Sequence, residues 1–144
     1  MEFFRPDPEA SKLLDELDWD AWFYTPGLPP RPHFDTSLID IVSDLSRKWQ
    51  SPSKTSFKPQ PSDVQDLTAN QIVVFLEQIL EFKYPLSPAS SSLMGEVYGF
   101  AKSKNTEVAY LYFQVGLKAG DESVVGPAAA LLGQVGRMKF VRPL

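Results

Sequence analysis

The chain has 144 residues, the size of a single domain, and its 43% hydrophobic and 12% aromatic content is that of a globular chain. A formal net charge of -4 provides no basic field for nucleic acid, and no stretch is long and apolar enough to span a bilayer. Cysteine is absent, which excludes disulfides and thiolate metal ligands. Since the N-terminus also lacks the features of a secretory signal, we expect a cytoplasmic protein that binds neither nucleic acid nor membranes.

Residues 8–25 are predicted to be helical in two pieces. Pro8 suits the first position of a helix because its missing N–H would be unpaired there, and Asp18 suits the cap of a second short helix. That second piece carries three aromatic residues, Trp19, Trp22 and Phe23. We interpret them as a packing anchor against another domain, because aromatic side chains dominate burial in cores and interfaces.

A proline-rich connector follows over residues 25–32, where four prolines remove backbone donors and fix φ. This connector divides the chain in two. We predict an N-terminal helical segment with its linker over residues 1–33, and a helical domain over residues 34–144.

Within the second region, apolar residues recur at the helical period in five successive segments, each after a capping signal. The signals are Asp35 or Thr36, Thr68 with Gln71 in capping-box spacing, Ser87 before Pro88, Asn105, and Asp121 or Ser123. The residues predicted to face inward are Leu38, Ile41, Val42, Leu45 and Trp49, then Ile72, Phe75, Leu76 and Ile79, then Leu93, Val97, Phe100 and Ala101, then Val108, Leu111, Tyr112 and Val115, then Val124, Ala128, Leu131, Leu132 and Val135. We expect a loop over residues 51–61 and helix ends at Gly120 and Gly136.

These patterns predict an all-α fold. No segment alternates at the period of a strand, and no Asn-Gly or Asp-Gly hairpin turn occurs. Short connections between helices favour antiparallel neighbours. We therefore expect antiparallel helical hairpins stacked as an armadillo- or HEAT-like α-α superhelix.

No catalytic set is found among the residues. The single histidine, His33, lies in the connector without other ligands nearby, and the His-Glu-x-x-His, Gly-x-Ser-x-Gly and P-loop motifs are absent. The acidic residues Asp15, Glu16, Asp18 and Asp20 fit a solvated helix face with an N-cap better than an acid/base pair. The sequence thus predicts no catalytic residue, no metal site and no cofactor in this chain.

Two cations follow the predicted helix break at Gly136, namely Arg137 and Lys139. An arginine can bind a carboxylate through two hydrogen bonds, and a nearby lysine adds a mobile charge. Basic residues near a chain end are also commonly solvated, and the spacing alone favours that interpretation.

Four blocks carry a resemblance to a known family: Asp18-Trp-Asp-Ala-Trp-Phe-Tyr-Thr-Pro-Gly-Leu-Pro-Pro, Phe34-Asp-Thr-Ser-Leu, Arg47-Lys-Trp and Gly136-Arg-Met-Lys-Phe-Val-Arg-Pro-Leu. In this order they resemble leukotriene A4 hydrolase and its fungal homologues, bifunctional enzymes of the M1 zinc aminopeptidase family. The matching region there is the C-terminal helical domain of armadillo-like build. The family's zinc ligands and catalytic residues lie upstream and have no counterparts here, and its helical domain continues beyond the position of Leu144.

The resemblance implies that Arg137 and Lys139 bind the substrate carboxylate, either a peptide C-terminus or a fatty-acid epoxide. The chain would then contribute substrate recognition and scaffolding to a catalytic domain on the same or a separate chain, with zinc held in that parent enzyme. The alternative is a stand-alone helical-repeat module for protein–protein interaction. An upstream His-Glu-x-x-His in the same reading frame would favour the first hypothesis, and a complete short gene the second.

Overall fold

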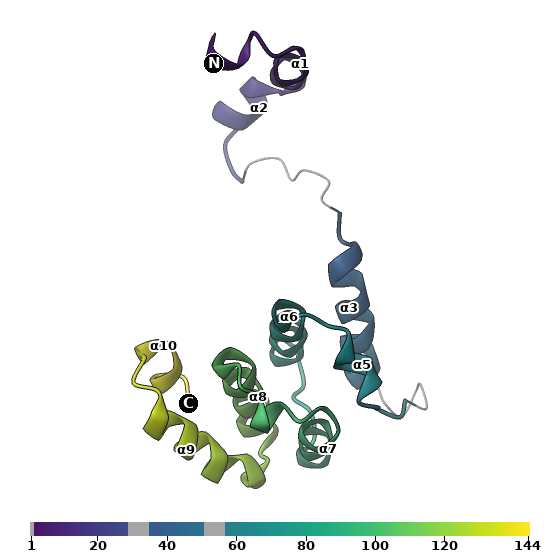
Figure 1. The fold of residues 1–144 in the computed structure, drawn as a ribbon, viewed down its shortest axis with the longest axis vertical. Helices are drawn as coiled ribbons and strands as arrows, with labels where there is room; N and C mark the ends of the chain where they lie inside the picture. The colour runs from purple at the N-terminus through teal and green to yellow at the C-terminus, as the bar shows by residue number, and fades with distance from the viewer. Residues whose placement is uncertain (1, 29–34, 51–56) are drawn as a thin grey trace. The chain divides into compact units, whose positions relative to one another are not determined.

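The computed structural model describes residues 2–28, 35–50 and 57–144, which form two compact units, Met1–Asp35 and Thr36–Leu144 (Figure 1). The predicted boundary between residues 33 and 34, and His33 itself, fall outside the described residues. Within the described ranges the regular structure is helical and no strand occurs.

The N-terminal unit contains a 3-10 turn, η1 (Glu2–Phe4), and the helices α1 (Pro8–Glu16) and α2 (Trp19–Phe23). The Asp7 carboxylate accepts hydrogen bonds from the backbone N–H groups of Glu9 and Ala10, so Pro8 lies at the start of α1 as predicted. Asp18 caps α2 by accepting from the N–H of Ala21. The two helices therefore begin where the capping residues require.

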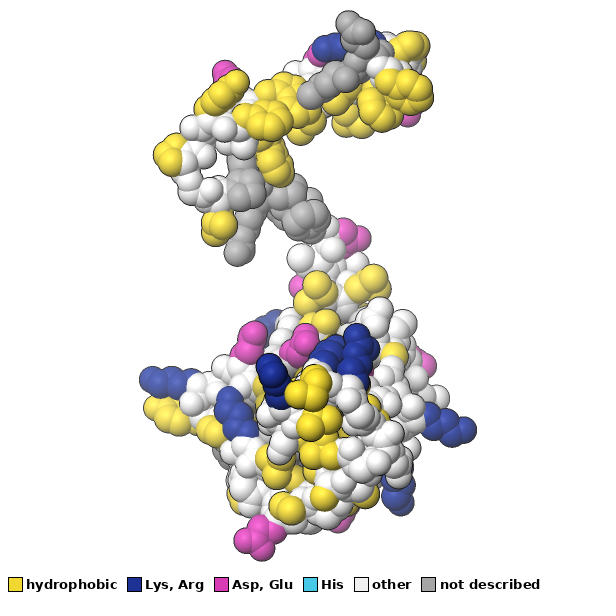
Figure 2. Space-filling model, turned by 90° about the vertical axis from the view of Figure 1, so that its left-hand side faces the viewer, with side chains coloured by type: hydrophobic (Ala, Val, Ile, Leu, Met, Phe, Trp, Pro, Cys, Tyr) yellow, Lys and Arg dark blue, Asp and Glu magenta, His cyan; other side chains and the backbone are white. Residues whose placement is uncertain are grey.

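This unit buries none of the residues of α1 and α2. Large apolar side chains are instead exposed to solvent: Phe3, Phe4, Leu13, Leu17, Trp22, Phe23, Tyr24 and Leu28. Figure 2 shows hydrophobic side chains over much of the visible surface of this unit. The described residues of this unit therefore gain little of the free energy that apolar burial supplies to folding.

The C-terminal unit consists of stacked helices: α3 (Ser37–Gln50), α5 (Ser62–Gln65), α6 (Ala69–Leu80), α7 (Pro88–Tyr98), α8 (Thr106–Ala119), α9 (Val125–Gln134) and α10 (Met138–Val141), with the 3-10 turns η2 (Phe100–Lys102) and η3 (Glu122–Val124). Helix α3 packs against α6, α6 packs against α8, and α8 also contacts α7 and α9 (Figure 1). The predicted all-α class with stacked helical hairpins is confirmed.

Capping residues begin and end these helices as the sequence predicts. Thr68 and Gln71 form both bonds of a capping box at α6. Ser87 accepts from the N–H of Ser90 at α7, and Asn105 accepts from the N–H of Glu107 at α8. Helix α8 ends at Gly120, whose φ of 72° lies in the left-handed region that other residues rarely adopt.

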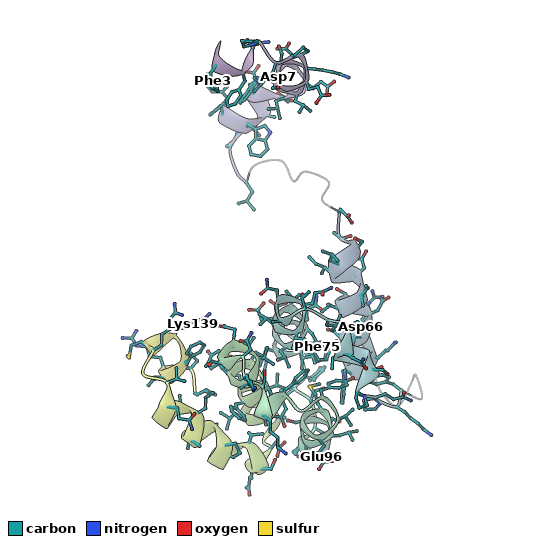
Figure 3. The ribbon with its side chains drawn as sticks, viewed as in Figure 1. Phe3, Asp7, Asp66, Phe75, Glu96 and Lys139 are labelled. Carbon is teal, nitrogen blue, oxygen red and sulfur yellow. The ribbon has the colours of Figure 1, made fainter. Side chains whose placement is uncertain are left out.

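Helix α8 is the centre of this unit. Eight of its residues are buried: Val108, Ala109, Tyr110, Leu111, Tyr112, Phe113, Val115 and Gly116. Gly116 allows η3 to pack directly on the helix, because a Cβ atom there would lie 2.7 and 2.8 Å from the two γ-carbons of Val124. Figure 3 shows Phe75 of α6 among the packed helices beside α8. The core is therefore built around one helix that is covered on several sides.

Two residues predicted to face inward on α3 do not. Leu38 is 68% exposed and Ile41 is 58% exposed, whereas Val42, Leu45 and Trp49 are buried. The apolar stripe is continuous in the sequence, but of its five residues only Val42, Leu45 and Trp49 belong to the buried core. Leu38 and Ile41 present apolar side chains to solvent.

The predicted helices after Ser87 and Asp121 also need correction. Helix α7 stops at Tyr98, Gly99 takes a left-handed φ of 68°, and Phe100 is buried on the separate turn η2. The apolar residue of α7 that is fully buried is Met94, beside the buried Ser91, while Leu93 is 42% exposed. After Asp121 the chain forms η3 before α9 begins, so the predicted single helix is two elements.

Asp121 is a buried carboxylate, 4% exposed, at the start of η3. It accepts hydrogen bonds from Ser92 Oγ at 2.8 Å, from the Ser123 N–H at 3.0 Å and from Ser123 Oγ at 2.5 Å. Burial acts to raise the pKa of this carboxyl, but the hydrogen bonds outweigh it and hold the pKa below its ordinary value. The ionised form thus ties α7 to the turn that follows α8.

Gly116→Ala tests the close approach of η3 to α8. The added methyl group meets both γ-carbons of Val124, so no rotamer of that residue relieves the clash. We expect the free energy of unfolding of the chain to fall by about 1–3 kcal/mol in urea denaturation, as for other overpacked cores. The matched control is Gly133→Ala on α9, where a Cβ meets nothing within 4 Å; it should raise stability by about 0.4–1 kcal/mol. Equal effects at both positions would contradict the close packing.

Asp121→Asn tests the buried carboxylate through its pH dependence. A carboxyl whose folded pKa is depressed contributes stability above its unfolded pKa and loses it as pH falls through the folded pKa. We expect Asp121→Asn to be less stable than the parent chain by about 1–3 kcal/mol at neutral pH. The difference should shrink as the pH is lowered through the acid range, measured by urea denaturation at each pH. Glu122→Gln, on the exposed side of the same turn, should stay within about 0.5 kcal/mol of the parent; a pH-independent gap for Asp121→Asn would refute the assignment.

Candidate functional site

The segment after α9 makes a short exposed turn. Helix α9 ends at Gln134, close to the predicted break at Gly136, and Arg137 takes an extended conformation as the N-cap of α10. The carbonyl oxygen of Arg137 accepts from the N–H groups of Phe140, at 2.9 Å, and Val141, at 3.2 Å. The side chains of Arg137 and Lys139 are both exposed. The turn therefore presents two cations, Arg137 and Lys139, with one residue between them.

Phe140 anchors this turn to the core. It is 6% exposed, and its ring lies edge-to-face against Tyr110 of α8 with the centroids 4.9 Å apart. Burial raises the pKa of the Tyr110 phenol, the Glu107 charge raises it further, and the Lys139 charge opposes both. The phenol, the carboxylate and the ammonium group therefore lie near one another.

Lys139 forms an ion pair with Glu107 of α8. Its Nζ lies 2.7 Å from Oε1 and 2.7 Å from Oε2 of the Glu107 carboxylate. The Glu107 side chain is 27% exposed and that of Lys139 is 52% exposed. Figure 3 shows Lys139 where α10 meets α8. The ion pair is therefore partly shielded from solvent on the carboxylate side.

An open hollow of about 530 Å³ lies beside this pair, lined by residues of α6, α8 and α10. Glu77, Glu81 and Glu107 contribute carboxylates to its wall, and Lys139 contributes the cation. In Figure 2, Lys and Arg side chains gather on the face that carries α10. Cations of the turn and carboxylates of the hollow thus adjoin each other.

The guanidinium of Arg137 is in a different situation from Lys139. Across the described residues it forms neither an ion pair nor a hydrogen bond. Such a group can bind a planar carboxylate with two parallel N–H···O bonds. The structure thus brings both sequence-predicted cations onto one turn but gives only Lys139 an internal partner. Glu107 was not predicted, because it is distant from Lys139 in the sequence and has no motif.

The predicted aromatic anchor forms only a small local contact. Trp19 stacks on Phe23 with centroids 5.9 Å apart, and its Nε1 donates to the carbonyl oxygen of Leu14 at 2.9 Å. Trp22 is 46% exposed and Phe23 is 70% exposed. The acidic residues nearby are solvated as expected, with Asp15 paired to Arg5 at 2.7 Å.

No metal-binding cluster of three or more His, Cys, Asp or Glu side chains is found over residues 2–28, 35–50 and 57–144. None of the helices in this part of the chain has the length and apolar character needed to cross a membrane.

Comparisons with known proteins agree with one another. Residues 67–144 match the family model for the C-terminal region of leukotriene A4 hydrolase. Leucine aminopeptidase 2 of Aspergillus terreus is 71% identical over 144 residues, and that of Aspergillus niger is 68% identical over 145 residues. Both alignments cover 100% of this chain, but only 23% and 24% of the respective relatives. The chain thus spans about a quarter of the length of these relatives.

Two solved structures of the yeast enzyme also match this chain. Native leukotriene A4 hydrolase from Saccharomyces cerevisiae matches with a TM-score of 0.78 and 35% identity, over 98% of this chain and 26% of the yeast chain. A second structure of the native yeast enzyme matches with a TM-score of 0.77 and 33% identity. With a family model matching residues 67–144 and helical architecture shared with the yeast structures, the chain belongs to the C-terminal domain family of leukotriene A4 hydrolase, within the M1 aminopeptidases.

Proposed function

We propose that this chain recognises the carboxylate of a substrate that another part of an M1 aminopeptidase cleaves. The observation that carries the proposal is the free Arg137 guanidinium beside Lys139 on an exposed turn, in the region matched by the family model. The catalytic groups, and the zinc that this family uses, belong to the other part of the protein. Absence of cysteine fits a reducing cytoplasm.

Arg137 is the primary ligand in this proposal. Its planar fork matches the two oxygens of a peptide C-terminus or of a fatty acid such as an epoxide-bearing lipid. Lys139 supports it as a second positive charge. The hydrogen bonds that form are charge-assisted, which makes them stronger than neutral ones.

The catalytic domain is the proposed partner of the N-terminal unit. Trp22 and Phe23 expose apolar rings that the described unit leaves without cover. Aromatic side chains of this kind commonly anchor interfaces. A stand-alone interaction module would use the same surface, but in the relatives the matching region is about a quarter of a longer chain, which supports the intramolecular partner.

Arg137→Ala tests the carboxylate clamp. The variant is made in a full-length chimera in which this chain replaces the matching segment of the Aspergillus terreus leucine aminopeptidase 2. We expect kcat/KM for a leucyl tripeptide with a free C-terminal carboxylate to fall about 10- to 100-fold, which corresponds to about 1.5–3 kcal/mol for a charge-assisted bond. Hydrolysis of leucyl anilide, which has no carboxylate, should stay unchanged.

The control for Arg137→Ala is Arg142→Ala, which removes another exposed arginine from the same end of the chain. It should change the ratio of tripeptide to anilide kcat/KM by less than about threefold, since a solvated charge at longer range is screened. The chain alone should cleave neither substrate. An unchanged ratio in Arg137→Ala would show that the clamp is misassigned.

Trp22→Ala tests the aromatic anchor. In the chain alone this side chain is 46% exposed, so its removal should shift the melting temperature little. In the full-length chimera we expect the free energy of unfolding to fall by about 3–5 kcal/mol, typical of truncating a buried aromatic residue. Thermal unfolding of both proteins, with and without the substitution, gives the comparison. The same small effect in both would mean that Trp22 is not packed on a partner domain.

A further inference from the structure

Helix α10 depends on its surroundings for its position. It has only four residues, and its N-cap residue, Arg137, makes no side-chain capping bond. A helix this short is not stable alone, because the entropy cost of nucleating it exceeds the stabilisation from the hydrogen bonds of a single turn. The place of Arg137 is therefore decided by what holds the next residues, and their contacts include Phe140 on Tyr110 and Lys139 on Glu107.

Glu107 lies on α8, the helix that buries eight of its own residues. It belongs to the first turn of α8, which Asn105 caps by accepting from the Glu107 N–H at 3.0 Å. The next residues, Val108 and Ala109, are buried at 2% and 3% exposure. The packing of α8 therefore sets the backbone position of Glu107, and the Glu107 carboxylate pairs with Lys139.

From this geometry we propose that Glu107 is a positioning residue for substrate binding, which holds the Lys139 ammonium ready beside Arg137. The proposal rests on the proposed function, because it takes the carboxylate clamp as given. Glu107 does not touch the substrate. It acts through Lys139, whose long flexible side chain would otherwise lose much rotamer freedom on binding.

The hydrogen-bonding capacity of the ammonium group supports this role. A lysine ammonium has three N–H donors. The Glu107 carboxylate takes up one of them, in the hydrogen bond from Nζ to Oε2 at 2.7 Å, and Oε1 also lies 2.7 Å from Nζ. Donors remain for a substrate carboxylate, and the Lys139 side chain is 52% exposed. A carboxylate bound to Arg137 can thus share the ammonium with Glu107.

The competing view is that Glu107 weakens the clamp by neutralising Lys139. Two features favour positioning. The first is that Glu77 and Glu81 also line the hollow, and neither carboxylate forms an ion pair across the described residues. Loss of the Glu107 charge would therefore remove only part of the negative charge of the hollow. The second is that Glu107 is the only carboxylate among the described residues that pairs with Lys139, and the Glu107 side chain is more shielded from solvent than that of Lys139.

The test is a double-mutant cycle in the full-length chimera, with Glu107→Gln, Lys139→Met and the two combined. The readout is the ratio of kcat/KM for the leucyl tripeptide to that for leucyl anilide. We expect Glu107→Gln to lower this ratio about three- to tenfold, through KM rather than kcat, as for lost binding of both ground and transition states. The double variant should be no worse than Lys139→Met, because Glu107 acts only through that residue.

Glu77→Gln is the matched control, since it removes the same charge from the same hollow without touching Lys139. It should leave the ratio unchanged or raise it. The anilide rate and the melting temperature report whether each variant folds. If Glu107→Gln leaves the ratio unchanged or raises it, or if the losses in the double variant add, the positioning role is refuted. If neither Glu107→Gln nor Arg137→Ala changes the ratio, the carboxylate clamp itself is refuted. If Arg137→Ala lowers the ratio and Glu107→Gln does not, only the positioning role of Glu107 is refuted.

Discussion

Burial of α8 is the constraint on which the C-terminal unit depends. Its residues from Val108 to Val115 are almost all excluded from water, and α6, α7 and α9 pack on it. Burying this much apolar surface supplies the main driving force for the unit. The packing on this helix also explains the glycine at position 116, which lets the turn η3 approach the helix backbone.

Both ends of α8 organise polar groups that the core itself cannot accommodate. Its first turn carries Glu107, which holds Lys139 of α10. Just beyond its last turn, Asp121 accepts hydrogen bonds from Ser92 and Ser123 and joins α7 to η3. Each carboxylate pairs with groups of neighbouring elements: Lys139 of α10 for Glu107, and Ser92 of α7 with Ser123 of η3 for Asp121. The proposed recognition site and a structural tie thus lie at opposite ends of one buried helix.

The two units differ in how far they bury their aromatic side chains. The C-terminal unit buries its aromatic residues, with Trp49 and Phe75 among its fully enclosed side chains. The N-terminal unit leaves Phe3, Phe23 and Tyr24 in solvent. The chain spans about a quarter of the length of the relatives that it matches.

The sequence by itself determined that the chain is helical and where several of its helices begin, because capping depends on local interactions. Thr68 with Gln71, Ser87 and Asn105 cap their helices as predicted, since a cap needs only residues within one turn. The motif around Arg137 was likewise readable from the sequence. Tertiary structure alone decided which side of an apolar stripe is covered, so Leu38 and Ile41 stay exposed and Met94 replaces Leu93 in the core. It alone also paired Lys139 with Glu107, because an ion pair between residues so distant in the chain exists only when packing brings α10 onto the first turn of α8.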